Sequence, residues 1–271
     1  MRIRRIGFLV ALGLVPLLAE AARAPPPIPC ARIAGGAGEI AELTGSFTFK
    51  LKDGMQVALL DVGLPGKGPG PSPASDAGRE AMRMLALGKS VHLYYEAKPA
   101  LREDRHGVRL VHVLVGAPGA SDAFWLQARL IEMGAALVDS WATNRACVSS
   151  LLPLEVFARE AERGLWTDAA NRPIPAERAS AARGRFALIE GTIVRARKIG
   201  GTIYLDFSDD WRRGLAVTVG GKAARLFARA GVDPLKLAGR RVRVRGYVDW
   251  GSGPVIAATH PEMLEFLPES R

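Results

Sequence analysis

The sequence predicts a mainly β protein with helices (α+β), in which strands close into β-barrels. Two observations favour this class. Residues 44–62 alternate apolar and polar side chains around a turn signal, and the chain after residue 183 consists almost entirely of short alternating segments. A length of 271 residues fits one large domain or two modest ones. A hydrophobic fraction of 48% excludes a largely disordered chain.

The N-terminus has the pattern of a secretory signal peptide. Arg2, Arg4 and Arg5 precede an uncharged apolar run over 6–18, and small residues follow it. We therefore expect a signal peptide over 1–21 and a secreted or periplasmic protein. The apolar run is shorter than the roughly 20 residues of a membrane span, so no span is expected after cleavage. An uncleaved anchor or a buried N-terminal helix is the alternative, and both Sec and twin-arginine export remain open.

Export makes the two cysteines informative, because disulfides persist in oxidising compartments. Cys30 follows a proline-rich stretch and Cys147 precedes a helical pattern. We expect a Cys30–Cys147 disulfide, with two unpaired buried thiols as the alternative. Two cysteines exclude a disulfide-dense scaffold and a four-cysteine zinc site.

The elements of the first domain, expected over 31–166, follow from periodicity and turn residues. Asp53-Gly54 predicts the turn of a hairpin over 44–62, and a Gly/Pro-rich loop follows over 63–75. Apolar spacing then predicts helices over 76–87, 124–137 and 150–163, and strands over 90–96 and 108–115. Residues 167–182 have little apolar periodicity and are expected to be a linker.

The second domain, expected over 183–271, reads as five strands and one helix. The strands are predicted over 186–194, 201–207, 215–219, 241–248 and 254–258, with a helix over 223–230 and a basic turn after the first strand. Five short strands with a helix between the third and fourth fit a small Greek-key barrel of the OB type.

The first domain resembles a known family in several elements. The matching segments are Val111-His112-Val113, the helix with Leu130 and Leu137, Leu59 to Pro65, and the ending Gly164-Leu165-Trp166. Over roughly 39–166 the chain is similar to the thermonuclease (staphylococcal nuclease-like) family. The resemblance implies an OB barrel with helices. Together with the second domain, which looks like an OB-type domain that accompanies such nucleases, it implies two OB-like barrels in tandem.

The same resemblance implies that the catalytic groups are missing. Family members cleave phosphodiesters with a calcium ion held by aspartates, a glutamate that activates water, and two arginines that neutralise the phosphate. The matching positions here hold Phe47, Ala58, Gly63, Gly66 and Val108. We expect a catalytically degenerate domain without calcium ligands or another cofactor. An active nuclease with non-standard residues is the alternative, with Asp61 and Arg109 as its fallback candidates beside Asp104 and Arg105.

Positive charge is concentrated in the second domain. The chain has a formal net charge of +10, and residues 183–271 contain sixteen Lys or Arg against nine Asp or Glu. A basic groove with stacking aromatic residues is how OB barrels hold single strands. The predicted nucleic-acid-binding residues are an alternating stripe of Arg241, Arg243 and Arg245, together with Arg195, Arg197, Lys198 and Trp211. A solvated strand face is the alternative.

Three functions remain open from the sequence. The first is an exported module that binds single-stranded nucleic acid or another polyanion, and the second is the non-standard nuclease. The third is an envelope protein whose barrels bind a protein partner. His112 lies in a strand pattern and is expected to be a packed or surface histidine rather than a metal ligand.

Overall fold

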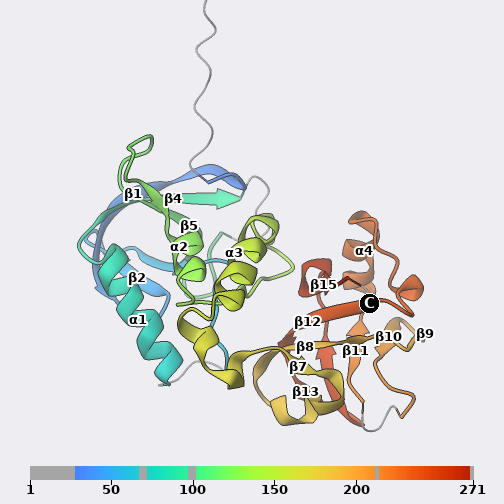
Figure 1. The fold of residues 1–271 in the computed structure, drawn as a ribbon. Coiled ribbons are helices and arrows are strands. Elements are labelled where there is room, and N and C mark those ends of the chain that lie inside the picture. Colours follow the sequence, from blue (N-terminus) through green and yellow to red (C-terminus); the bar gives the residue numbers. More distant parts are fainter. Residues whose placement is uncertain (1–27, 67–71, 97–101, 211–213, 269–271) are drawn as a thin grey trace, which may run out of the picture.

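The computed structural model describes residues 28–66, 72–96, 102–210 and 214–268 and confirms a mainly β fold with helices. Two barrel-like units lie side by side, with α3 (Val148–Glu160) facing the second unit (Figure 1). The expected signal peptide, residues 1–21, and Trp211 lie outside the described residues. None of the helices in the described ranges is long and apolar enough to cross a membrane.

The first unit is a closed barrel of five strands. A parallel pairing between β3 and β5 closes the order β1-β2-β3-β5-β4, and β6 extends the sheet beyond β5. The hydrophobic core fills the barrel and the space beneath its helices. The elements are β1 (Ala31–Leu43), β2 (Thr48–Leu51), β3 (Gln56–Leu59), α1 (Pro73–Ala86), β4 (Ser90–Glu96), β5 (Arg109–Val115), β6 (Phe124–Trp125), α2 (Leu126–Glu132) and α3.

Local chemistry explains where these elements begin and turn. Gly54 takes a φ of 89° in the β2–β3 turn, a backbone conformation that favours glycine, and the Asp53 carboxylate accepts a 2.9 Å hydrogen bond from the Met55 amide. Helix α1 begins at Pro73, three residues before the predicted start. Ser72 and Ser75 form a reciprocal capping box there, and Pro73 occupies a first-turn position that needs no amide donor.

Strand β1 is the largest element that the sequence pattern did not predict. It pairs with β2 on one side and with β4 on the other, so it holds the barrel together. Its central run, Ala34–Gly38, has no large apolar side chain to produce a recognisable alternation. Bulges interrupt both of its pairings, which further disrupts the two-residue period.

The second unit has the same strand order and is an OB-like barrel. Strand β8 continues into β9 and β12 continues into β13, so two sheets share these chain segments. When β8–β9 and β12–β13 are each counted as one strand, β11 is the third strand of this barrel and β14 is the fifth. These two strands pair in parallel, as β3 and β5 do in the first unit. The elements are β8 (Phe186–Thr192), β9 (Arg195–Ile199), β10 (Thr202–Asp206), β11 (Ala216–Val219), α4 (Gly221–Arg229), β12 (Arg241–Tyr247), β13 (Asp249–Trp250), β14 (Pro254–Ala257) and β15 (Leu264–Phe266).

Two expectations for this half need correction. The expected basic turn after the first strand is itself strand β9, because Arg195 to Ile199 pair residue by residue with β10. The expected linker over 167–182 is not a free connection. It forms short 3₁₀ turns and β7 (Ile174–Pro175), which pairs with β8, and three alanines near its end are buried in the second core. The small alanine side chains allow this close packing, but they produce little of the apolar periodicity from which secondary structure is predicted.

The disulfide between Cys30 and Cys147 is confirmed. It ties the residue before β1 to the residue before α3, across a sequence separation of 117. Cys147 is fully buried in the first core. A disulfide fits a protein of an oxidising compartment.

We predict that replacing both cysteines by alanine lowers the free energy of unfolding by about 2–4 kcal/mol, because a long loop is then unrestrained in the unfolded chain. Urea denaturation of the variant and of the oxidised protein measures the difference. Reduced wild-type protein is the control and should unfold at the urea concentration of the variant. A loss below about 0.5 kcal/mol would show that the bond adds little to stability.

Candidate functional site: the basic sheet face of the second barrel

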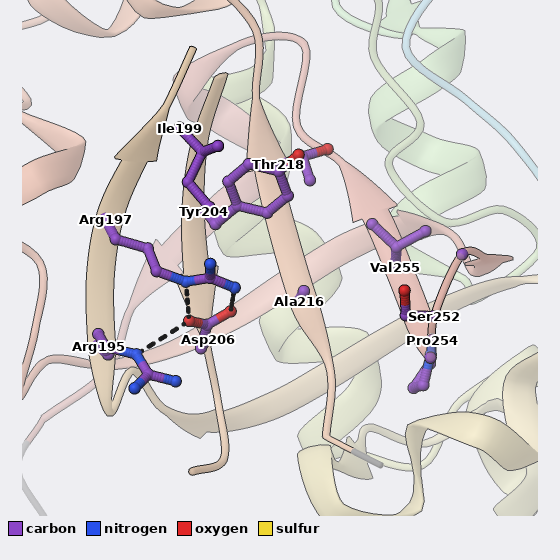
Figure 2. A pocket seen from close by; sticks show the side chains of 12 residues that line it. Arg195, Arg197, Ile199, Tyr204, Asp206, Ala216, Thr218, Ser252, Pro254 and Val255 are labelled. Atoms are coloured by element: carbon purple, nitrogen blue, oxygen red, sulfur yellow. Dashed lines mark hydrogen bonds and ion pairs between the residues drawn. The ribbon is translucent and has the colours of Figure 1, made fainter. Parts of the chain in front are cut away.

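One face of the second barrel carries a hollow of about 690 Å³ (Figure 2). Strands β9, β10, β11 and β14 form its floor, and the loop after β13 forms one side. The side chains on the floor combine two arginines, one aromatic ring, one carboxylate and several small or apolar groups. They are Arg195, Arg197, Ile199, Tyr204, Asp206, Ala216, Thr218, Pro254 and Val255.

Strand alternation places these side chains on one face. In β9, Arg195 and Arg197 point into the hollow, whereas Ala196 packs against the core. In β10, Tyr204 and Asp206 alternate with Ile203 and Leu205, which are buried in the same core. The sequence therefore contained the signal for Tyr204 and Asp206, although only the basic residues of the neighbouring segment were singled out.

A buried carboxylate holds the two guanidinium groups in place. Asp206 accepts a hydrogen bond of 3.2 Å from Arg195 Nε and one of 2.8 Å from Arg197 Nε. The Arg197 guanidinium also lies 5.2 Å from the centre of the Tyr204 ring, a cation–π contact. Two positive charges against one negative charge leave the floor positive, and both arginines keep an exposed part.

This arrangement suits a flat anionic ligand. A base can stack on the Tyr204 ring, while the outer N–H groups of Arg195 and Arg197 reach phosphate oxygens. Lys198 is exposed but lies outside the set of residues that line the hollow.

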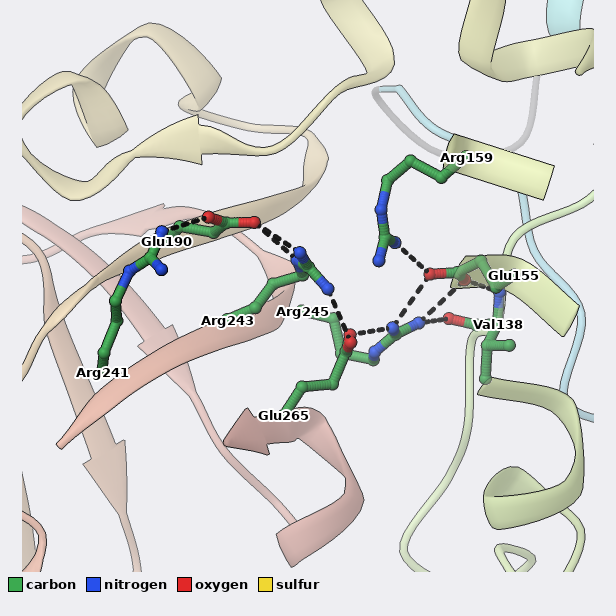
Figure 3. A network of polar contacts seen from close by, with 8 residues as sticks. All are labelled: Val138, Glu155, Arg159, Glu190, Arg241, Arg243, Arg245 and Glu265. Atoms are coloured by element: carbon green, nitrogen blue, oxygen red, sulfur yellow. Dashed lines mark hydrogen bonds and ion pairs between the residues drawn. The ribbon is translucent and has the colours of Figure 1, made fainter. Parts of the chain in front are cut away.

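The arginine stripe of β12 does not form a ligand face, which corrects the sequence-based interpretation. Arg245 is 1% exposed and reaches into the first unit (Figure 3). Its two terminal nitrogens each lie 3.0 Å from an oxygen of Glu155 in α3, and one also donates to the Val138 carbonyl at 2.7 Å. Glu265 accepts a further bond from Arg245.

The other two arginines of the stripe belong to the same network. Arg243 is largely covered and donates to Glu190 and Glu265, at 2.8 Å in each case. Arg241 contacts Glu190 at 3.3 Å and is the most exposed of the three. Arg245 therefore joins the two units, whereas Arg241 and Arg243 pair with carboxylates of the second unit. An apolar cluster of Leu137, Ala158, Trp166, Phe186 and Leu188 lies at the same interface.

The five positions that the sequence resemblance assigned to catalytic groups carry no ionisable side chain. Phe47 is buried in the core, Ala58 lies in β3, and Val108 precedes β5. The backbone of Gly63 bridges to Leu137, and that of Gly66 bridges to Phe186 in the second unit.

The fallback candidates Asp61 and Arg109 do not meet at one surface. The Asp61 side chain is fully buried beside His112, with 3.6 Å between Oδ2 and Nε2. Arg109 donates to the Gly35 carbonyl at 3.1 Å and lies 3.5 Å from Glu103. His112 is fully buried, with its ring edge-on to Trp125. The sequence reasoning did not single out Glu96, whose carboxylate lies 3.8 Å from His112 Nε2.

Comparison with known proteins adds no family to this description. No protein-family model matches the chain, and no curated protein matches it.

A buried histidine of the second unit contacts the first unit. His260 lies after β14, and its Nε2 is 2.8 Å from the Ser140 hydroxyl of the first unit. Its Nδ1 is 2.9 Å from Thr259 Oγ1. Burial, with a smaller contribution from the charges of Arg145 and Arg245, lowers the pKa of His260 to about 4.

We predict that this histidine makes the folded protein less stable as the pH falls from about 6.5 to about 4. The unfolded chain takes up the proton at the higher pH, whereas folded His260 resists it, so the contribution to stability is present above about 6.5 and is lost as the pH approaches 4. The effect is at most about 3 kcal/mol.

The measurement is urea denaturation of the wild type and His260→Gln between pH 4 and 7. Burial also raises the pKa of nearby Asp139 to about 6, and this shift makes the folded protein more stable as the pH falls. The difference between the two proteins therefore isolates the histidine. A difference that stays constant across this range would contradict the prediction.

Proposed function

We propose that the chain is an exported, thermonuclease-like protein that has lost catalysis and binds single-stranded nucleic acid or another polyanion. The binding surface is the hollowed sheet face of the second barrel. The observation that carries the proposal is the placement of Arg197 over Tyr204, beside Arg195, on that face.

The geometry supports a single strand rather than a duplex. A base that stacks on Tyr204 has to be unpaired and accessible, which a single strand offers at no unpairing cost. The hollow is of a size that holds a few nucleotides at most, and further contacts would come from the positive charge elsewhere on residues 183–271.

Loss of catalysis is supported by the first barrel. Its matching positions carry no carboxylate and no arginine, and the Asp61 carboxylate is enclosed where a phosphodiester cannot reach it. Removing one electrostatic stabiliser typically lowers the rate by about 10²–10³, and here several are missing together. Export is supported by the N-terminal pattern and by the disulfide, and a periplasmic or secreted location follows from these.

We predict that a fluorescent oligodeoxythymidine binds the protein with an affinity that falls steeply with salt. Arg197→Gln and Tyr204→Ala should each weaken binding, the tyrosine change by about 1–3 kcal/mol. Arg229→Gln, an exposed change at the end of α4, removes the same charge outside the hollow and should leave the affinity within about twofold. Fluorescence anisotropy at several salt concentrations measures all four proteins.

The same samples test the alternatives. Absence of binding at low salt, or equal losses for Arg197→Gln and Arg229→Gln, would contradict a defined site. Incubation with Ca²⁺ should leave the oligonucleotide intact. Cleavage that Asp61→Ala abolishes would instead support an active nuclease with non-standard residues. Neither binding nor cleavage would point to a protein partner in the envelope.

A further inference from the structure

Three buried polar side chains of the first unit lie close together. They belong to a different unit from the basic sheet face described above. Asp61 lies two residues after the β3–β5 pair of Leu59 and Val111, and His112 follows Val111 directly. In the neighbouring pairing, His112 stands opposite Tyr94, and Glu96 is the next residue of β4 on the same side. Strand register therefore brings Asp61, Glu96 and His112 together.

The distances between their ligand atoms match those around one metal ion. His112 Nε2 lies 3.6 Å from Asp61 Oδ2 and 3.8 Å from Glu96 Oε1. The three atoms all lie within 4.8 Å of one another. Two ligands at about 2.1 Å from a tetrahedral zinc ion would be about 3.4 Å apart. These separations are too long for hydrogen bonds but close to those of a coordination shell.

Two of the three side chains in the cluster, Asp61 and His112, lack hydrogen-bond partners. Within the described ranges, neither carboxylate oxygen of Asp61 and neither ring nitrogen of His112 makes a hydrogen bond, although both side chains are fully buried. A buried polar group without a partner costs free energy, and a buried carboxylate costs more. No group in the described ranges donates a hydrogen bond to the buried oxygens of Asp61, so these oxygens can bind a ligand that comes from outside the chain.

The electrostatic surroundings favour a cation. The carboxylates of Glu96, Asp139 and Glu262 lie close enough to repel the negative charge of Asp61, whose side chain is fully buried. Asp61 also has a φ of 60°, a strained conformation for a residue other than glycine, and such strain tends to occur at functional positions. A divalent ion would neutralise the charges of Asp61 and Glu96 together.

Glu96 is held in a fixed orientation. Its Oε1 accepts a 2.9 Å hydrogen bond from the Ala146 amide, and its Oε2 accepts one of 3.2 Å from the Arg145 amide. Such outer contacts position a carboxylate ligand. Cys147 Sγ also lies in the cluster, but its bond to Cys30 removes it as a thiolate ligand.

We infer that Asp61, Glu96 and His112 form a buried site for a first-row divalent transition-metal ion, with Zn²⁺ as the best match. One imidazole and two carboxylates suit such an ion, whereas Ca²⁺ takes six to eight oxygen ligands at longer distances. Enclosure by the core gives the ion a structural role that is independent of polyanion binding. It also means that the ion is loaded while the chain folds.

The experiment refolds the full, disulfide-bonded chain from denaturant and chelator, with Zn²⁺ or without added metal. After gel filtration, elemental analysis should find one Zn²⁺ per chain, and the Zn²⁺-loaded protein should melt at a higher temperature than the metal-free protein. Refolding with Co²⁺ should give the visible absorption of a low-symmetry, four- or five-coordinate site. Fewer than about 0.1 Zn²⁺ per chain would overturn the inference.

Variants separate the site from adventitious binding. Asp61→Asn keeps the shape and tolerates the backbone conformation, so it should fold, yet it should bind Zn²⁺ roughly a hundredfold more weakly or not at all. Its metal-free form should be at least as stable as metal-free wild type, because a buried carboxylate is gone. His106→Ala removes an exposed histidine and should retain full loading. Loading of Asp61→Asn equal to that of the wild type would overturn the inference.

Discussion

The buried ion pair between Arg245 and Glu155 is the interaction on which the arrangement of the two barrels depends. Its two hydrogen bonds, each 3.0 Å long, connect β12 of the second unit to α3 of the first. Moving both charges out of water costs several kcal/mol each, so the pair is tolerated because most of the remaining N–H and oxygen positions also have partners, although within the described ranges the buried Nε of Arg245 has none. Val138 and Glu265 accept hydrogen bonds from the terminal nitrogens of Arg245, while Val138 and Arg159 donate to Glu155. The geometry of all these groups has to be maintained together, which fixes one orientation of the units.

This constraint also determines which basic surface remains for a ligand. The β12 arginines are used within the protein, and their charge is cancelled by carboxylates. Arg195 and Arg197 share a single carboxylate and lie at the edge of a hollow instead. Within the hollow, the available positive charge therefore comes from Arg195 and Arg197 of β9, and Asp206 of β10 offsets part of it.

Sequence reasoning was most successful where a side-chain period or a turn residue determines local structure. The hairpin around Gly54 and the strands β4, β5 and β12 were predicted in this way, whereas the disulfide was predicted from the expected export of a chain with two cysteines. Strand β1 was not, because its glycine-rich centre has no apolar alternation. The candidate site was predicted in part. Alternation correctly placed Arg241, Arg243 and Arg245 on one side of a strand, but it contains no information about which element packs on that side.

The same limit applies to the first barrel. The sequence shows Asp61 as a carboxylate near the end of the predicted hairpin over 44–62, but its enclosure with Glu96 and His112 depends on the pairing of three strands. Polar residues that are far apart in sequence thus meet in the buried part of the first unit. The two barrels accordingly differ in chemistry despite a common strand order: an enclosed acidic cluster in one and an open basic face in the other.

A double-mutant cycle on Arg245 and Glu155 tests the role of the interface most directly. Urea denaturation would compare the wild type with Arg245→Met, Glu155→Leu and the double variant. Each single change should cost about 3–5 kcal/mol, because it leaves a buried charge without its partner. The double variant should lose at least about 2 kcal/mol less than the sum of the two. Additive losses, within about 0.5 kcal/mol, would contradict a direct pair between the two barrels.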